Sequence, residues 1–230
     1  MKKILILGGL ALALMSRAAM TSQDVPPSPL ARDLFNALPD TLMPLLTQVN
    51  RADCIDFLES RMKAEVTNRF GAKSEMTRLT DDFIELRLSD KSRWQMKVLP
   101  TSDSTHVICT VSTVFVPEAD SHIIFYSTDW QPLDRQAYLP AEPRLDDFFR
   151  TPTDSLLRPV FEREKARADI PLMRASLSPE ARTLTYEQTA TQLLDSTDAE
   201  KLKPYLKDYL IFKWVDRNKS AIFAPTIDKQ

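Results

Sequence analysis

The residues best suited to metal binding or nucleophilic catalysis lie together in one stretch, THVICTVSTVFVPEADSHIIFYST, from Thr105 to Thr128. This stretch contains both histidines of the 230-residue chain, His106 and His122, and one of its two cysteines, Cys109. Imidazole and thiolate groups are common zinc ligands and common members of catalytic pairs. The first question is whether the fold can bring these three side chains to one point.

The pattern around these residues predicts a hairpin that keeps them apart. Alternating apolar residues indicate strands over 106–116 and 121–128, joined by the loop PEAD. In that register His122 lies opposite a position near Phe115, which is about nine residues from His106 along the first strand. At ~3.3 Å per residue, the two histidines are then roughly 30 Å apart. Because zinc ligands lie about 2 Å from the metal, this separation argues against a shared metal site.

Carboxylates offer a second kind of chemistry. Acidic residues cluster at three places: Asp53 with Asp56 and Glu59, Asp81 with Asp82, and Asp146 with Asp147. Two carboxylates can perform acid–base or glycosidase chemistry when their surroundings separate their pKa values. Aspartates near helix starts more often serve as caps or solvated groups. These clusters indicate a hydrolase only if the fold places one of them in a cleft that raises its pKa.

The residues best placed for binding are aromatic and basic. Trp130 and Tyr138 lie in a proline-rich connection, STDWQPLDRQAYLPAEP, and connections of this kind often carry binding residues. The alternative for Trp130 is packing into a seam between two lobes. Arg87, Arg93 and Lys97 alternate with apolar residues, so they share the polar face of a predicted hairpin and indicate a recognition surface.

The first residues predict export. A basic pair at Lys2 and Lys3 precedes an apolar run, and small residues follow at Ser16 and Ala18, which is the pattern of a cleaved signal peptide at residues 1–18. The apolar run is shorter than the roughly 20 residues that span a bilayer. No later segment is apolar enough to do so. We therefore expect a soluble periplasmic or extracellular protein.

The two cysteines bear on anchoring and on redox state. No cysteine follows the apolar run until Cys54, so a lipoprotein anchor is not expected. In an exported protein two cysteines can pair, and one hypothesis is a disulfide between Cys54 and Cys109 that ties a helix to the sheet. The alternative is two inert buried thiols, since Cys109 shares a strand face with Val107 and Val111.

Composition excludes several classes of protein. Without the signal segment the chain has 27 basic and 32 acidic residues, so it has no electrostatic reason to bind nucleic acid. Of the three glycines, only Gly71 lies outside that segment. Phosphate-binding loops, dinucleotide fingerprints and the nucleophile elbow each need more than one glycine. We expect no cofactor site of these kinds, and no metal site.

The period of the apolar residues changes along the chain. After a proline-rich linker at residues 19–29, helical spacing predicts a short helix over 30–38. An apolar stripe from Ile55 to Val66 predicts a longer helix that stops at Gly71. From residue 82 the period becomes two, and DFIELRLSDKSRWQMKVLP reads as a hairpin with one apolar and one charged face.

Helices followed by hairpins occur twice. After residue 141 the chain is again helical and broken by prolines, and the hairpins MRASLSPEARTLTYEQT and YLIFKWVDRNKSAIFAP follow. We predict an α+β fold of two tandem helix-then-antiparallel-meander units, at residues 30–140 and 141–230, with helices packed on one face of each four-stranded sheet. This plan suggests an internal repeat by duplication; the alternative is one continuous eight-stranded domain.

Three sequence segments resemble a known family: NRADCIDFLESRMKAEVTNRFGAKSEMTRLTDDF, WQMKVLP and YSTDWQPL. They are similar to exported proteins from Bacteroidales that are classed as having unknown function, most strongly from Asn50 to Pro132. The resemblance implies a location in a Gram-negative envelope and supplies no activity, cofactor or site residue. The tandem plan also looks like the two-lobed architecture of β-lactamase inhibitor protein, with no shared motif.

Two hypotheses for the function follow from these patterns. The first is a non-enzymatic exported binding or envelope-accessory protein, which uses an open sheet face and the inter-lobe aromatics to meet an envelope or extracellular protein. The second is an envelope hydrolase with a paired-carboxylate site. The scarcity of glycine and the separation of the histidines favour the first.

Overall fold

The computed structural model describes residues 29–101, 103, 105–217 and 220–226; the predicted signal peptide and nearly all of the predicted linker lie outside these ranges. The helices are α1 (Ala31–Asn36), α2 (Gln48–Glu59), α3 (Arg135–Tyr138), α4 (Arg158–Lys165) and α5 (Ser196–Leu202), with 3-10 turns η1 (Leu145–Phe148), η2 (Ala190–Leu193) and η3 (Lys203–Tyr205). None of the described helices is long and apolar enough to cross a bilayer.

The strands form two antiparallel sheets. The first sheet contains β1 (Ala64–Thr67), β2 (Lys73–Leu79), β3 (Phe83–Ser89), β4 (Ser92–Pro100), β5 (His106–Phe115), β6 (Ala119–Ser127) and β7 (Pro132–Leu133), in sequence order. The second contains β8 (Met173–Leu177), β9 (Thr183–Gln188), β10 (Leu210–Arg217) and β11 (Ser220–Pro225), again with sequence neighbours paired. The predicted α+β class with antiparallel meanders is confirmed.

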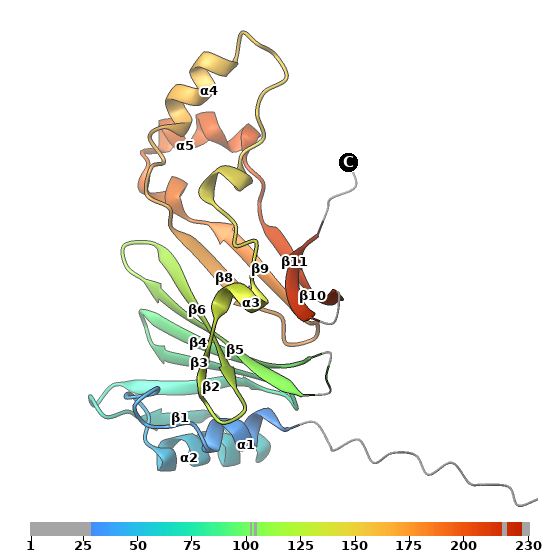
Figure 1. Ribbon diagram of the computed structural model, residues 1–230. Helices are drawn as coiled ribbons and strands as arrows, with labels where there is room; N and C mark the ends of the chain where they lie inside the picture. The colour runs from blue at the N-terminus through green and yellow to red at the C-terminus, as the bar shows by residue number, and fades with distance from the viewer. Residues whose placement is uncertain (1–28, 102, 104, 218–219, 227–230) are drawn as a thin grey trace, which may run out of the picture.

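The elements are stacked in layers (Figure 1). Helices α1 and α2 cover one face of the seven-stranded sheet, and the four-stranded sheet lies on the other face. Helices α4 and α5 lie beyond the second sheet, at the end of the molecule farthest from α1 and α2. The first sheet is therefore covered on both faces, and the charged face that the sequence suggested to be open is partly beneath the second sheet.

The first sheet has seven strands where four were predicted, and the additional strands are β1, β2 and β7. Strand β1 forms where a helix was predicted, because α2 ends earlier than the apolar stripe indicates. Arg61 adopts φ 59°, the left-handed conformation that ends many helices and that glycine usually supplies. The amide of Met62 then donates to the Phe57 carbonyl oxygen at 2.8 Å and closes the helix end. Val66 consequently lies in β1, and Gly71, with φ 80°, lies in the turn between β1 and β2.

Two hydrophobic cores hold the layers together. The first lies between the helices and the seven-stranded sheet, and its buried residues include Phe35, Leu46, Cys54, Met76, Leu86, Trp94, Met96 and Trp130. The second lies between the two sheets and includes Phe83, Cys109, Val111 and Phe125 from the first sheet and Leu184, Tyr186, Phe212 and Phe223 from the second. The two sheets thus bury their apolar faces against each other.

Because the apolar face of the second sheet is occupied by the first sheet, α4 and α5 do not pack on it as predicted. They pack around a third, smaller cluster of Phe149, Phe161, Ala168 and Leu202. The two sheets differ in strand number, which gives no support to an internal duplication or to a β-lactamase-inhibitor-protein layout. The boundary near residue 140 stays a prediction; in the chain it falls between α3 and η1.

Candidate functional site

The hairpin of β5 and β6 keeps the histidines and Cys109 apart, although its register differs from the predicted one. His122 pairs with Ser112 rather than lying near Phe115. His106 is six residues further along β5, which corresponds to roughly 20 Å. Cys109 points to the opposite sheet face, into the second core. Among the described residues, no group of three or more His, Cys, Asp or Glu side chains could hold a metal ion.

The structure does not contain the disulfide between Cys54 and Cys109 that was one of the two alternatives. Both thiols are free and fully buried. Cys54 belongs to the core beneath the helices, whereas Cys109 belongs to the core between the sheets. The seven-stranded sheet separates the two cysteines, so no bond can join them without unfolding that sheet.

We expect both thiols to be unreactive in the folded protein. Burial raises the pKa of Cys54 to about 11 and raises the pKa of Cys109 far above its ordinary value. At about pH 8 the attacking thiolate is therefore scarce as well as covered. A thiol reagent should label neither cysteine of the folded chain, and both after denaturation without a reductant. Fewer than two thiols in the unreduced, denatured chain would contradict the structure.

The two predicted aromatic binding residues occupy different cores. Trp130 is only 4 % exposed and lies in the first core, where its indole Nε1 donates to the Leu34 carbonyl oxygen at 2.9 Å. This hydrogen bond joins Trp130 to α1. Trp130 therefore lies neither on an exposed surface nor between the predicted lobes. Tyr138 is half-buried beside the second core, with its ring stacked 5.1 Å from that of Phe125 and 6.1 Å from that of Trp214.

The second sheet covers most of the predicted recognition face. Strand β8, at the edge of that sheet, contacts β4, β5 and β6. Its alternate amides turn away from β9 and donate to side chains of the first sheet: Met173 to Asp120 Oδ1 at 3.2 Å, Ala175 to Ser121 Oγ at 2.9 Å and Leu177 to Gln95 Oε1 at 2.9 Å. An edge strand buried in this way needs such acceptors for its amides.

Lys97 lies in the part of the first sheet that the second sheet covers, so it is not available to a partner. Its side chain is 2 % exposed. The ammonium donates to the Pro179 carbonyl oxygen at 3.1 Å and forms an ion pair with Asp82 at 3.0 Å. The sequence pattern placed Lys97 correctly on the polar face of the hairpin, but that face meets the second sheet here and not solvent.

Arg87 and Arg93 remain exposed, on the part of the same face that the second sheet leaves uncovered. They are directly opposite each other in the ladder between β3 and β4. Arg87 forms an ion pair with Glu75 on β2. Among the described residues Arg93 takes part in no salt bridge, and its guanidinium lies 5.7 Å from the centroid of the Phe115 ring. Among the described residues, Arg93 is therefore a cation without a carboxylate partner.

Arg93 lines a small pocket where the two sheets meet, which we call the seam pocket. Its volume is about 210 Å³, and its lining consists of Glu85, Arg93, Gln95, Thr113 and Phe115 from the first sheet and Arg174, Ala175 and Ser176 from β8. Gln95 and Thr113 are buried, so the inner part of the pocket lining belongs to the interface between the two sheets. The sequence indicated Arg93, but it held no local signal for Arg174, which lies on a distant strand.

The charged groups of the seam pocket are held in defined positions. Glu85 accepts hydrogen bonds from Gln95 Nε2 at 2.6 Å and from Thr77 Oγ1 at 2.8 Å. Arg174 forms an ion pair across the ladder with Glu187 on β9. Thr113 Oγ1 lies 2.8 Å from Ser121 Oγ, the hydroxyl that also anchors β8. The pocket therefore contains two guanidinium groups and one carboxylate whose oxygens already have donors.

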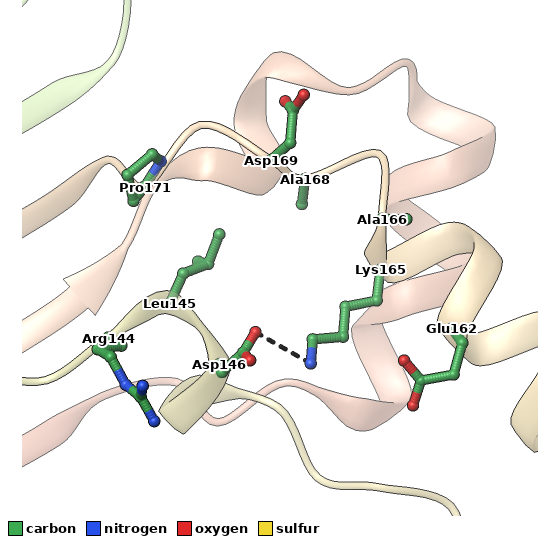
Figure 2. A pocket seen from close by; sticks show the side chains of 9 residues that line it. All are labelled: Arg144, Leu145, Asp146, Glu162, Lys165, Ala166, Ala168, Asp169 and Pro171. Atoms are coloured by element: carbon green, nitrogen blue, oxygen red, sulfur yellow. Dashed lines mark ion pairs between the residues drawn. The ribbon is translucent and has the colours of Figure 1, made fainter.

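A larger hollow, about 380 Å³, lies between η1 and the end of α4, and Figure 2 shows its lining. Leu145 points into it, and Asp146 forms an ion pair with Lys165 at 3.0 Å. Most of its lining side chains are exposed. Since Asp146 and Lys165 neutralise each other and water reaches most of the lining, this hollow is a weaker candidate than the seam pocket.

The predicted hydrolase would use a carboxyl group in a cleft with a raised pKa. Asp147, beside the larger hollow, instead accepts a hydrogen bond from the Arg144 amide at 2.7 Å and so caps η1. Hydrogen bonds to Lys63, Thr101 and Arg163 lower the carboxyl pKa of three residues: Glu65, Asp103 and Glu164, respectively. These three pKa shifts are opposite in direction to the one that the hydrolase hypothesis requires.

Comparisons with known proteins agree with the resemblance noted in the sequence at its coarser level. A family model described as "Protein of unknown function (DUF3256)" matches residues 27–218. A solved structure of a domain of an uncharacterized protein from Porphyromonas gingivalis W83 is similar, with a TM-score of 0.72 and 28% sequence identity over 87% of this chain and 100% of that chain. No curated protein matches.

Proposed function

The chain belongs to the DUF3256 family, whose description assigns no function, and we propose from its geometry that it is an exported binding protein whose ligand enters the seam pocket. The predicted signal peptide at residues 1–18 supports export. The ligand belongs to an envelope or extracellular partner, as the predicted location implies. In this proposal, the second sheet and the first each supply part of the binding surface.

One observation carries the proposal. Polar residues of both sheets line the seam pocket, and one of them, Arg93, forms no salt bridge to any described residue. The other predicted binding residues have structural partners: Trp130 a carbonyl oxygen, Tyr138 two aromatic rings, Lys97 a carboxylate and a carbonyl oxygen, and Arg87 a carboxylate. Buried polar residues that converge on a concave site are a common feature of binding sites.

The proposal predicts where ligands touch the protein. A library of small acidic, basic and neutral compounds would be added to the purified ¹⁵N-labelled chain, and amide shifts would be followed by NMR. We expect binding compounds to shift the amides of Thr113, Phe115 and Ser176, because these residues line the seam pocket. The matched comparison is the larger hollow, reported by Leu145 and Lys165. Shifts confined to that hollow, or no shifts from any compound, would contradict the proposal.

A further inference from the structure

We infer that the seam pocket is a carboxylate site, in which Arg93 and Arg174 hold the carboxylate end of a ligand while the remainder of the ligand lies outside. This inference rests on the proposed function, because it assigns a chemical class to the group that enters the same pocket. Four features support it: the charge opposite Arg93, the charges of the lining, the size of the pocket and the planar shape of a guanidinium group.

Arg93 faces a like charge across the ladder. Directly opposed residues of antiparallel strands have Cβ atoms about 4.5–5.5 Å apart, and like charges at such positions repel each other. Arg87 and Arg93 form such a pair, yet Glu75 neutralises only Arg87. The Phe115 ring contacts the Arg93 guanidinium without neutralising its charge. An anion bound beside Arg93 supplies the counter-charge that Arg93 lacks among the described residues.

The charges of the lining fit a ligand with one negative charge. Arg93 and Arg174 contribute two positive charges to the pocket wall, and Glu85 contributes one negative charge. Because Glu187 already pairs with Arg174, Arg93 is the lining guanidinium that lacks a carboxylate partner among the described residues, and a ligand with one negative charge is enough to pair with it. A doubly charged phosphate would bring a second negative charge close to Glu85. Arg174 has five N–H donors and uses part of this capacity on Glu187, so donors remain for a ligand.

The size and shape of the pocket narrow the class further. A volume of about 210 Å³ is below the roughly 300–1,000 Å³ typical of sites that enclose a whole small molecule. The pocket therefore takes the end of a ligand. A guanidinium is planar and matches a planar carboxylate through two parallel hydrogen bonds. The Phe115 ring centroid lies 5.7 Å from the Arg93 guanidinium, so one wall of the pocket beside this group is apolar.

The test compares charged and neutral ligands of one shape. Butyrate, butyramide, sulfate and inorganic phosphate would be titrated into the purified chain at low ionic strength, with NMR shifts of the seam-pocket amides as the readout. We expect butyrate to saturate these shifts and butyramide not to. The substitutions Arg93→Gln and Arg174→Gln should each weaken butyrate binding by at least ~10-fold, the effect of losing a charged hydrogen bond.

Arg87→Gln is the matched control. It removes the same charge from the ladder partner of Arg93, but Arg87 does not line the pocket and has Glu75 as its partner. We expect butyrate affinity in this variant to stay within about 3-fold of the parent. Circular dichroism would establish that all three variants are folded; each replaced side chain is at least partly exposed, which favours intact folding.

The remaining outcomes separate the inference from the proposed function. Sulfate or phosphate binding more tightly than butyrate would overturn the carboxylate assignment, and so would unchanged butyrate affinity in Arg93→Gln. Neutral compounds that bind in the pocket while all anions fail would overturn the inference and leave the proposed function standing. If no compound of any charge shifts the seam-pocket amides, both are overturned.

Discussion

Replacing Arg51 with methionine is expected to lower the free energy of unfolding by about 3 kcal/mol. The Arg51 side chain is 1 % exposed, and its guanidinium donates to the carbonyl oxygens of Leu38 at 2.6 Å and Leu46 at 3.0 Å. Both belong to the irregular segment between α1 and α2, which forms few backbone hydrogen bonds of its own. Methionine would fill much of the volume but leave two buried carbonyl groups without these donors.

Arg51 also binds the carboxylate of Asp40 at 3.0 Å, and this contact provides the control. Arg69 contacts the same carboxylate from an exposed position, with 44% of its side chain accessible. Arg69→Met should therefore cost less than about 1 kcal/mol, as for other exposed ion pairs. Urea unfolding followed by circular dichroism would give both values. A loss below about 1 kcal/mol in Arg51→Met would show that its hydrogen bonds to the two carbonyl groups contribute little.

The sequence predicted the hairpins well because their signal is local. The four predicted hairpins, β3 with β4, β5 with β6, β8 with β9 and β10 with β11, are all present. Strand β1 was missed because the residue that ends α2, Arg61, is not of a type that marks a helix end. An apolar residue such as Val66 fits a helical stripe and a short strand equally well, and only the backbone at Arg61 decides between them.

The covering of the first sheet could not be predicted from one strand at a time. Gln95 and Lys97 look like solvent-facing residues, yet they bind the edge strand of a sheet about 80 residues away in sequence. Strand β5 carried a partial signal. Val107, Cys109 and Val111 on one face and Ile108 on the other are all buried, as expected for a strand covered on both faces. That signal pointed to a second layer without identifying which segment forms it.

The same limit applies to the candidate site. Arg93 was predicted because its strand face is readable from local alternation. Arg174 was not, because β8 contributes it only after the second sheet has docked on β4, β5 and β6. A site made by two sheets exists only in the assembled fold, so its stability and its binding depend on the core between them. This dependence leads to a prediction about that core.

Phe125→Ala is expected to lower the free energy of unfolding by about 3–5 kcal/mol, the usual cost of removing a buried phenyl ring. Phe125 is 0% exposed. Its ring centroid lies 5.1 Å from that of Tyr138, 6.5 Å from Trp214 and 6.3 Å from Phe223, so it joins β6 to α3 and to the second sheet. The cavity would form between the two sheets, where neither sheet can close it alone.

The shared core also predicts how the variant unfolds. Trp94 and Trp130 report the first core and Trp214 lies beside the second, so fluorescence senses both layers, while circular dichroism senses the whole backbone. If the two sheets depend on one core, both probes should follow a single transition that moves to lower urea concentration in Phe125→Ala. Phe70→Ala removes the same ring from a position that is 80% exposed and should shift it by less than about 0.5 kcal/mol. Separate transitions in the parent chain would mean that the sheets fold independently, and the seam pocket could then open without unfolding either sheet. Equal effects of the two substitutions would mean that the buried Phe125 ring contributes no more to stability than an exposed ring does.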